Sequence, residues 1–395
     1  MKKEPQMNTD GHRLNSFLRK LLDGAGVEWK ALGEIIEPRR GRRLVKSQLQ
    51  ESGRHAVYQN SMTPLGYYED SNVQPKTTFI ICAGAAGEIG YSEDAFWAAD
   101  DVYFFLSNDK INSKFLYHFL LQKKPEISSQ VRRASIPRLP KTGFEKLSIP
   151  IPCPEDPEKS IEIQAEIVRI LDTFTELTTE LTTELTTRKK QYNHYRDQLL
   201  SFEDGEVEWK TLGELAENLD YMRKPITSGL RVSGKFPYYG ASGIVDYVKD
   251  YIYDGDFLLV SEDGANLLAR STPIAFSISG KNWVNNHAHV LRFESYADRR
   301  YVEYYLNSID LTPYISGAAQ PKLNQANLNS IRIPNPSFEN KARIVATLDK
   351  FDTLTHSINE GLPREIELRQ KQYEYYRNLL LNFPKPKKGT TDEHR

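Results

Sequence analysis

The chain contains only two cysteines among its 395 residues, Cys82 and Cys153, and no motif pairs them. This scarcity excludes a disulfide framework and leaves two ordinary thiols. No apolar stretch approaches the roughly 18 residues that a helix needs to cross a bilayer. No apolar segment follows Lys2 and Lys3, as a secretory signal would require. We therefore expect a cytoplasmic protein without a membrane segment.

An excess of one charge is also missing, because 52 basic residues are matched by 53 acidic ones and the net charge is −1. The overall field therefore does not indicate nucleic acid, and such evidence has to come from local runs. Two segments are basic, residues 38–46 (PRRGRRLVK) and residues 132–141. For either segment alone, a solvated surface is the more ordinary interpretation.

The chain does contain a copy of itself. The segment VEWKALGEI at Val27 returns 180 residues later as VEWKTLGEL at Val207, with seven of nine residues identical. Each half runs from a variable globular part into a long helical segment, which predicts two domains of about 100 to 200 residues each. Three further pairs follow in the same order, namely Pro137–Pro152 with Pro321–Pro336, Gln164–Phe174 with Lys341–Phe351, and the helical segments that begin at Lys190 and Lys371.

Between the matched segments the two halves diverge, as HAVYQNSMTPLGYYE from His55 does against FPYYGASGIVDYVKD from Phe236. Both stretches are strand-like and are broken by Gly, Asn or Pro. Similar scaffolds that carry different loops predict two domains that recognise different targets.

Apolar residues recur every three or four positions in the two helical segments, which is the pattern of a coiled-coil seam. The two seams should pack against each other, with a kink or short break near Gly361 and Pro363. The seam residues are Ile167, Leu171, Phe174, Leu177, Leu181, Leu185 and Tyr192 in the first segment and Ile344, Leu348, Phe351, Tyr373 and Tyr376 in the second.

The first helical segment contains a four-residue repeat, TELTTELTTELTT, from Thr175 to Thr187. The offset between the halves grows here from 177 to 181 residues, so they differ by the length of one unit. A threonine-rich helix surface is the plain structural interpretation. However, a helix of about 40 residues spans about 60 Å, and four residues add about 6 Å and about 40° beyond a full turn. Since this resembles one or two base-pair steps, we predict that the number of units sets the spacing of two DNA half-sites.

Taken together, these motifs closely resemble the specificity subunits of type I restriction-modification systems, and their C-type branch in particular. The resemblance covers nearly the whole chain and rests on LGE at each domain start, IPIPCP, IVRILDTFTELTTEL and GLPREIELRQKQYEYYR. It implies an α+β fold in which two mixed α/β target-recognition domains are separated by a pair of long antiparallel coiled-coil helices, as a pseudo-twofold internal duplication. The expected parts are a segment 1–26 with a short helix at Leu14–Leu22, recognition domains at 27–156 and 205–339, helices at 157–204 and 340–383, and a tail at 384–395.

The resemblance also implies the partners. Each recognition domain would read one half of an asymmetric site in double-stranded DNA, and two methylation subunits would dock on the helices. Restriction subunits would join through this core of two methylation subunits and one specificity subunit (M2S1). The chain itself would bind no cofactor, since S-adenosylmethionine and ATP with Mg²⁺ would belong to the partner subunits.

Reading bases requires Arg or Lys for guanine and Asn or Gln for adenine, while Arg, Lys, Ser and Tyr hold phosphates. Arg138 and Lys322 stand at matched positions between Pro and Leu, where a phosphate contact and a plain surface charge remain equally open. The DNA-binding candidates are Arg39, Arg40, Arg42, Arg43, Lys46, Tyr58, Gln59, Asn60, Arg132, Arg133 and Arg138 in the first half, and Arg223, Lys224, Tyr238, Tyr239, Lys281, Asn282, Asn285, Asn286, Lys322, Asn324 and Gln325 in the second.

Two other classes of function remain open, an adenine methyltransferase and a coiled-coil adaptor. The segment NPSF at Asn335 is similar to a methyltransferase motif, but its counterpart PCPE at Pro152 indicates a turn at the end of a domain. The glycines of AGAAGEIG, residues 83–90, have the wrong spacing for a nucleotide loop and favour a tight turn between strands. We expect no catalytic centre. The divergent, polar arms disfavour an adaptor.

A metal site is also disfavoured. His287 and His289 could ligate a metal from one face of a strand, but no third ligand lies near them in the sequence. We therefore expect no metal in this chain.

Overall fold

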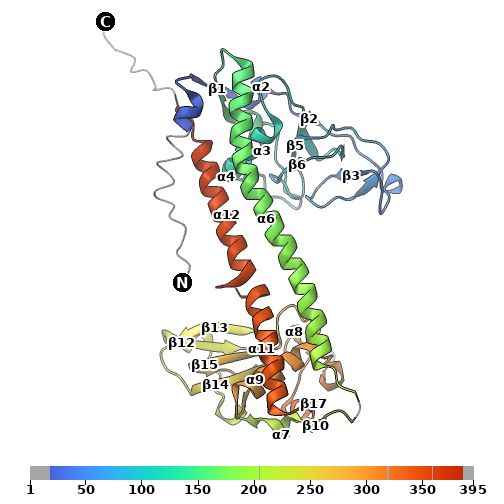
Figure 1. The fold of residues 1–395 in the computed structure, drawn as a ribbon, viewed down its shortest axis with the longest axis vertical. Helices are drawn as coiled ribbons and strands as arrows, with labels where there is room; N and C mark the ends of the chain where they lie inside the picture. The colour runs from blue at the N-terminus through green and yellow to red at the C-terminus, as the bar shows by residue number, and fades with distance from the viewer. Residues whose placement is uncertain (1–17, 204, 318–319, 358, 386–395) are drawn as a thin grey trace. The chain divides into compact units, whose positions relative to one another are not determined.

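A computed structural model describes residues 18–203, 205–317, 320–357 and 359–385 (Figure 1). The chain divides into two compact units, Met1–Leu181 with Ile366–Arg395, and Thr182–Glu365. Each unit has its own sheets, helices and hydrophobic core. No helix among the described residues is both long and apolar enough to cross a membrane.

The first unit is built on two sheets. Four strands pair antiparallel in the order β2-β8-β5-β6, and three form a second sheet, β4-β3-β7, in which β3 and β7 run parallel. A separate pair, β1 with β9, joins the first and last strands of the domain. The bounds are β1 Val27–Ala31, β2 Arg39–Arg40, β3 His55–Tyr58, β4 Gly66–Tyr68, β5 Thr77–Ile81, β6 Ile89–Ser92, β7 Trp97–Ala98, β8 Val102–Phe105 and β9 Ser148–Pro152.

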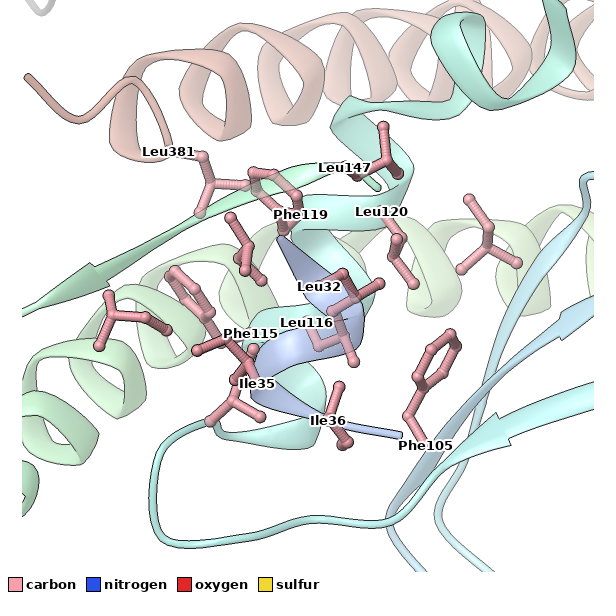
Figure 2. Packing of buried hydrophobic residues seen from close by; sticks show 14 of the residues in the cluster. Leu32, Ile35, Ile36, Phe105, Phe115, Leu116, Phe119, Leu120, Leu147 and Leu381 are labelled. Atoms are coloured by element: carbon pink, nitrogen blue, oxygen red, sulfur yellow. The ribbon is translucent and has the colours of Figure 1, made fainter. Parts of the chain in front are cut away.

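Helix α3 connects the four-stranded sheet to the core of the first unit. Asn112 begins it, because its side-chain oxygen accepts hydrogen bonds from the backbone N–H groups of Lys114 and Phe115. Phe115, Leu116, Phe119 and Leu120 then fall on one face and are fully buried, as Figure 2 shows. The short helices of this unit are α2 Leu32–Ile35, η1 Lys46–Gln48, α3 Ser113–Gln122, α4 Lys124–Ser129 and α5 Thr142–Glu145.

The second unit has one six-stranded sheet in the order β11-β16-β14-β15-β12-β13 and a separate pair, β10 with β17. Its strands are β10 Glu208–Thr211, β11 Glu217–Asn218, β12 Ser233–Gly240, β13 Gly243–Val248, β14 Tyr253–Ser261, β15 Ala275–Val284, β16 Ala288–Arg292 and β17 Arg332–Asn335. Its short helices are α7 Leu212–Leu215, η2 Asp220–Met222, η3 Ser228–Leu230, α8 Asn266–Ala269, α9 Tyr296–Ser308, η4 Thr312–Tyr314 and α10 Gln325–Asn329.

The two units repeat one framework, as the sequence predicts. Strands β5, β6 and β8 of the first unit correspond to β14, β15 and β16 of the second, and both units contain one parallel pair at a tryptophan, Trp97 or Trp283. The indole N–H of Trp97 donates to the carbonyl of Arg42 at 2.7 Å, and that of Trp283 donates to the carbonyl of Lys224 at 2.5 Å. This shared bond places Arg42 and Lys224 at equivalent positions.

One difference explains why the sheets are counted differently. In the second unit β15 is one continuous strand. It pairs with β14 along most of its length and with β12, in parallel, at its end. In the first unit the same path is interrupted between Ser92 and Trp97, so β6 and β7 belong to separate sheets.

The long helix α6 (Pro157–Leu200) begins in the first unit and ends in the second. It packs against α12 (Gly361–Leu380) in the first unit, where the rings of Phe174 and Tyr376 stack at 4.9 Å. It packs antiparallel against α11 (Phe338–Thr355) in the second, through Tyr195 on Phe351 and Tyr192 on His356. The predicted antiparallel seam is thus present in each unit.

The predicted interruption of the second helical segment is a full break. Helix α11 ends at Thr355 and α12 begins at Gly361, whose φ is +77°. A Cβ at Gly361 would lie 2.3 Å from the carbonyl oxygen of Thr353, so glycine is required there. Pro363 follows in the first turn of α12, where its missing N–H costs little.

The first and last described segments of the chain pack together in the first unit. The predicted N-terminal helix is seen at residues 18–22, while its first residues, 14–17, lie outside the described part. Leu18 and Leu22 are buried in the same core as Leu380 and Phe383. The indole N–H of Trp29 also donates to the carbonyl of Pro384 at 2.9 Å. Of the predicted tail, residues 386–395 lie outside the described residues.

Two segments that resembled enzyme motifs are turns. Residues 82–88 join the antiparallel strands β5 and β6, with Gly84 and Gly87 at positive φ. The NPSF segment connects β17 to α11, and its counterpart connects β9 to α6.

Candidate nucleic-acid interface

Two segments of the first unit, the β5–β6 turn and residues 132–139, meet at the end of β5. The backbone N–H of Leu139 donates to the carbonyl of Cys82 at 2.9 Å, and that of Gly84 donates to the carbonyl of Pro137 at 3.1 Å. Arg132 and Arg138 exchange two backbone hydrogen bonds, of 2.8 and 3.1 Å. The segment 132–138 is therefore a small hairpin-like loop fixed to the β5–β6 turn.

These segments line a cavity of about 370 Å³. We call it the basic cavity, after its four cationic side chains, Arg40, Arg132, Arg138 and Lys141. The remaining lining residues are Cys82, Asp101, Tyr103, Ala134, Ile136, Leu139 and Pro140.

Carboxylates only partly balance these cations, and Lys141 lies 3.6 Å from Glu145, which is outside the lining. Asp101 is the one acidic residue among those that line it, and its carboxylate lies 3.9 Å from the guanidinium of Arg138. Arg40 donates through Nε to the backbone carbonyl of Asp100 at 2.7 Å. Burial raises the pKa of the Cys82 thiol to about 12, so this group stays neutral at physiological pH.

A basic strap, residues 39–43, runs beside the cavity. It is pinned to the sheets by two backbone bonds, from Gly41 to Val102 at 2.9 Å and from Arg42 to Ala98 at 2.8 Å. A Cβ at Gly41 would lie 2.2 Å from the carbonyl oxygen of Ala98, so only glycine allows this close approach. The side chains of the strap's four arginines are exposed, as is that of Lys46 in η1.

The remaining candidates of the first unit are less uniform. Tyr58 is half-buried, and its ring packs against Phe79 and Phe96. Gln59 is half-buried, and Asn60 is exposed beside the β5–β6 turn, where its carbonyl accepts from the N–H of Ala85 at 2.9 Å.

The equivalent place in the second unit has different chemistry. The backbone bond from Leu323 to Glu262 matches that from Leu139 to Cys82, and the pair Ser316–Lys322 matches Arg132–Arg138. Glu262 thus stands where the first unit has Cys82.

Glu262 binds two predicted DNA contacts. Its carboxylate lies 2.5 Å from Arg223 and 3.0 Å from Lys322. Burial alone would raise the pKa of Glu262, but hydrogen bonds from Arg223 and Lys322 lower it below its ordinary value. Arg223 also lies 3.2 Å from Asp220, and its side chain is 14% exposed. Both cations are therefore compensated within the protein.

The same network contains a set of potential metal ligands, Asp220, Glu262 and His289, whose ligand atoms lie within 4.8 Å of one another. The expectation that no further ligand lies near His289 is therefore wrong. Asp220 is 69 residues away in sequence, but its carboxylate oxygen lies 2.5 Å from Nδ1 of His289. Arg223 and Lys322 already neutralise the two carboxylates, and Nε2 of His289 faces the carbonyl of Leu323 at 2.7 Å. This arrangement favours an ion-pair network over a cation site.

Several candidates of the second unit lie in the interior. Tyr238 is 1% exposed, Asn282 is 0% exposed and Asn285 is 6% exposed. Asn285 accepts from the N–H of His287, and Asn324 caps α10 through the N–H of Asn327. These side chains stabilise the domain, so we leave them out of the proposed interface. The exposed candidates of this unit are Lys224, Lys281, Asn286, Lys322 and Gln325, and Tyr239 is half-buried.

The sequence did not predict the polar contacts that join each domain to its long helices. In the first unit, buried His118 of α3 lies 3.1 Å from Asp172 of α6 and 2.8 Å from the hydroxyl of Tyr373 of α12. In the second, Arg300 of α9 lies 2.9 Å from Asp349 of α11. The signal was present, because Asp172 and Asp349 occupy the same position in IVRILDTF and IVATLDKF.

Comparison with known proteins matches both halves of the chain. Residues 25–188 and 205–368 each match the family described as type I restriction modification DNA specificity domain. The chain is 35% identical over 414 residues to the type I restriction enzyme EcoR124I/EcoR124II specificity subunit of Escherichia coli, covering 94% of this chain and 98% of that protein. It is 33% identical over 381 residues to the EcoprrI specificity subunit of Escherichia coli, covering 87% and 92%.

A solved structure shares the fold. The S subunit of a type I restriction-modification system from M. genitalium aligns with a TM-score of 0.64 and 18% identity, over 92% of this chain and 98% of that one. Because the family domain occurs twice and the relatives align over nearly their whole length, this chain belongs to the family of type I restriction-modification DNA specificity subunits.

Proposed function

We propose that this chain reads a split, asymmetric site in double-stranded DNA, with one recognition domain for each half-site. The observation that carries the proposal is the contrast at the end of β5 and β14. One backbone framework presents a basic cavity in the first unit and a neutralised network in the second. Two surfaces this different would not recognise the same base pairs.

The catalytic steps belong to other subunits in this proposal. Two methylation subunits dock on the helices, once against each unit, and restriction subunits join that core in the cytoplasm. S-adenosylmethionine and ATP with Mg²⁺ are bound by these partners. The duplication supports two docking sites, because α6 with α12 and α6 with α11 repeat the same kind of helix pair.

A domain exchange tests the proposal. Residues 27–156 are replaced by the first recognition domain of a relative with a different target, and methylated adenines are mapped across the genome of a host that carries the partner subunits. One half-site should change while the other is retained. Methylation of the original site by the exchanged chain, or of a defined site in a host without this chain, would show that the chain does not determine the target.

A further inference from the structure

Arg132 and Arg138 form an arrangement that is unfavourable in the isolated protein. They are partners in an antiparallel bridge, so their side chains extend from the same face, with Cβ atoms about 5.5 Å apart. Like charges at such positions repel each other. Arg40 and Lys141 line the same cavity. The one lining carboxylate, that of Asp101, lies 3.9 Å from Arg138, and Glu145, outside the lining, lies 3.6 Å from Lys141.

The second unit lacks this repulsion between like charges. Ser316 replaces one of the two cations, and Glu262 neutralises the other, Lys322, at 3.0 Å. At the position of Glu262 the first unit has the neutral thiol of Cys82. The first unit therefore has extra positive charge and lacks the internal anion.

From this difference we infer that the basic cavity of the first unit binds a phosphate group of the DNA backbone. The assignment rests on the proposed function, and it distinguishes Arg138, a phosphate ligand, from Lys322, which is paired with Glu262. Arginine guanidinium groups present parallel N–H donors that match phosphate oxygens, and Lys141 adds a point charge. The phosphate takes the place that the Glu262 carboxylate occupies in the second unit.

A backbone phosphate fits better than a free anion because the cavity opens onto more cationic surface. Arg40 belongs both to the cavity and to the exposed strap that carries Arg39, Arg42 and Arg43. Ile136, which also lines the cavity, is 53% exposed. Adjacent cations along an open surface suit consecutive phosphates of one strand.

The test measures binding of mixed-sequence 50-base-pair duplexes to the full-length chain, purified with its methylation subunits, at several salt concentrations. Arg132→Gln and Arg138→Gln should each weaken binding roughly tenfold and lower the slope of log affinity against log salt by about one. Because Arg132→Gln also removes a repulsion, its melting temperature should equal or exceed that of the wild type, which separates lost binding from lost structure.

Two matched controls sharpen the test. Lys146→Gln removes the same charge from an exposed residue of the same domain outside the cavity, and should leave the salt slope unchanged. Cys82→Glu transfers the internal carboxylate of the second unit into the cavity, and should reduce binding as the arginine variants do. Cys82→Gln, of nearly the same size as Cys82→Glu but neutral, isolates the effect of the charge, so it should bind duplex more tightly than Cys82→Glu.

The outcomes are distinct. If the wild type binds duplex and the two arginine variants keep its affinity and salt slope, the cavity is not a DNA site, although the proposed function stands. If inorganic phosphate binds at constant ionic strength and Arg132→Gln abolishes only that binding, the cavity serves free phosphate and the inference is overturned. If the wild type binds no duplex, both the proposed function and the inference fail.

Discussion

Two residues at equivalent positions, Cys82 and Glu262, differ in charge, since the thiol of Cys82 is neutral and the carboxylate of Glu262 pairs with cations. Glu262 has a side chain that is 10% exposed and it compensates the buried Arg223, whereas the neutral Cys82 adds no negative charge among its neighbouring cations. A single difference between repeats thus separates a residue that stabilises its domain from one that leaves a surface ready for a ligand.

Glu262→Gln should destabilise the second unit by about 3 kcal/mol, because it leaves the largely buried Arg223 without one of its two carboxylate partners. Hydrogen exchange of the β14 and β16 amides in increasing urea measures this loss. Lys322→Gln is the matched control, and it should cost less than about 1 kcal/mol, because Lys322 is 52% exposed. Equal protection in the Glu262 variant and the wild type would contradict the role given to this carboxylate.

His118 makes the first unit sensitive to pH. Burial lowers the pKa of His118, so the neutral ring donates from Nε2 to Asp172 and accepts at Nδ1 from the Tyr373 hydroxyl. The folded chain then binds fewer protons here than the unfolded chain. Its stabilising contribution is complete above the ordinary pKa of about 6.5 and falls as the pH decreases below that value.

Thermal unfolding between pH 7.5 and 5.5 checks this prediction. The melting temperature of the wild type should fall across this range, and that of His118→Gln should fall less. Glutamine can make both hydrogen bonds without titrating. Asp172 does not titrate in this pH range and so does not contribute to the difference between the two pH profiles. Burial alone would raise the pKa of Asp172, but hydrogen bonds from His118 and Lys114 lower it below its ordinary value. Parallel pH profiles for the two proteins would assign the effect elsewhere.

At the scale of elements, the periodicity of the sequence predicts the helices well because a seam is a local pattern. The break before Gly361 was predictable for the same reason, since glycine and proline act on their own turn. The contacts that define the candidate site were not predictable. Glu262 meets Arg223 across 39 residues, and Asn282 looked like a base-reading residue although it is buried. Which polar side chains face inward depends on strand pairing, which no local pattern specifies.

The repeat in α6 is the element whose length should matter most. Its leucines Leu177, Leu181 and Leu185 are half-buried along the seam, and hydroxyls such as that of Thr187 donate to carbonyls of the preceding turn. Deleting Leu181–Glu184 shortens the helix by about 6 Å. The spacing of the methylated half-sites should decrease by one or two base pairs while their sequences stay the same. Mapping methylated adenines tests this, with Thr182→Ala/Thr183→Ala as a control of equal length. An unchanged spacing in the deletion variant would contradict the prediction that the number of repeat units sets the half-site spacing.

For the whole molecule, the duplication was the most informative feature of the sequence. It predicted two units on one framework, and the matched pairs β1 with β9 and β10 with β17 confirm that framework. It could not reveal that one unit neutralises its cations internally. That difference depends on a few substitutions, such as Glu262 for Cys82, within otherwise matched backbone. We therefore expect the target sequence to depend on the positions at which the repeats differ.

The pseudo-twofold relation inferred from the duplication predicts an unusual result for an exchange of the two recognition domains within the chain. A twofold axis across the duplex exchanges its two antiparallel strands. If the first domain reads its half-site 5′ to 3′ on one strand, the second domain therefore reads its half-site 5′ to 3′ on the other strand. Placing residues 205–339 in the first position and residues 27–156 in the second should then give the reverse complement of the original site, which is the same duplex sequence. The half-site sequences that carry methylated adenines should be unchanged. A head-to-tail repeat would instead transpose the half-sites and produce a new target, and genome-wide methylation mapping distinguishes the two.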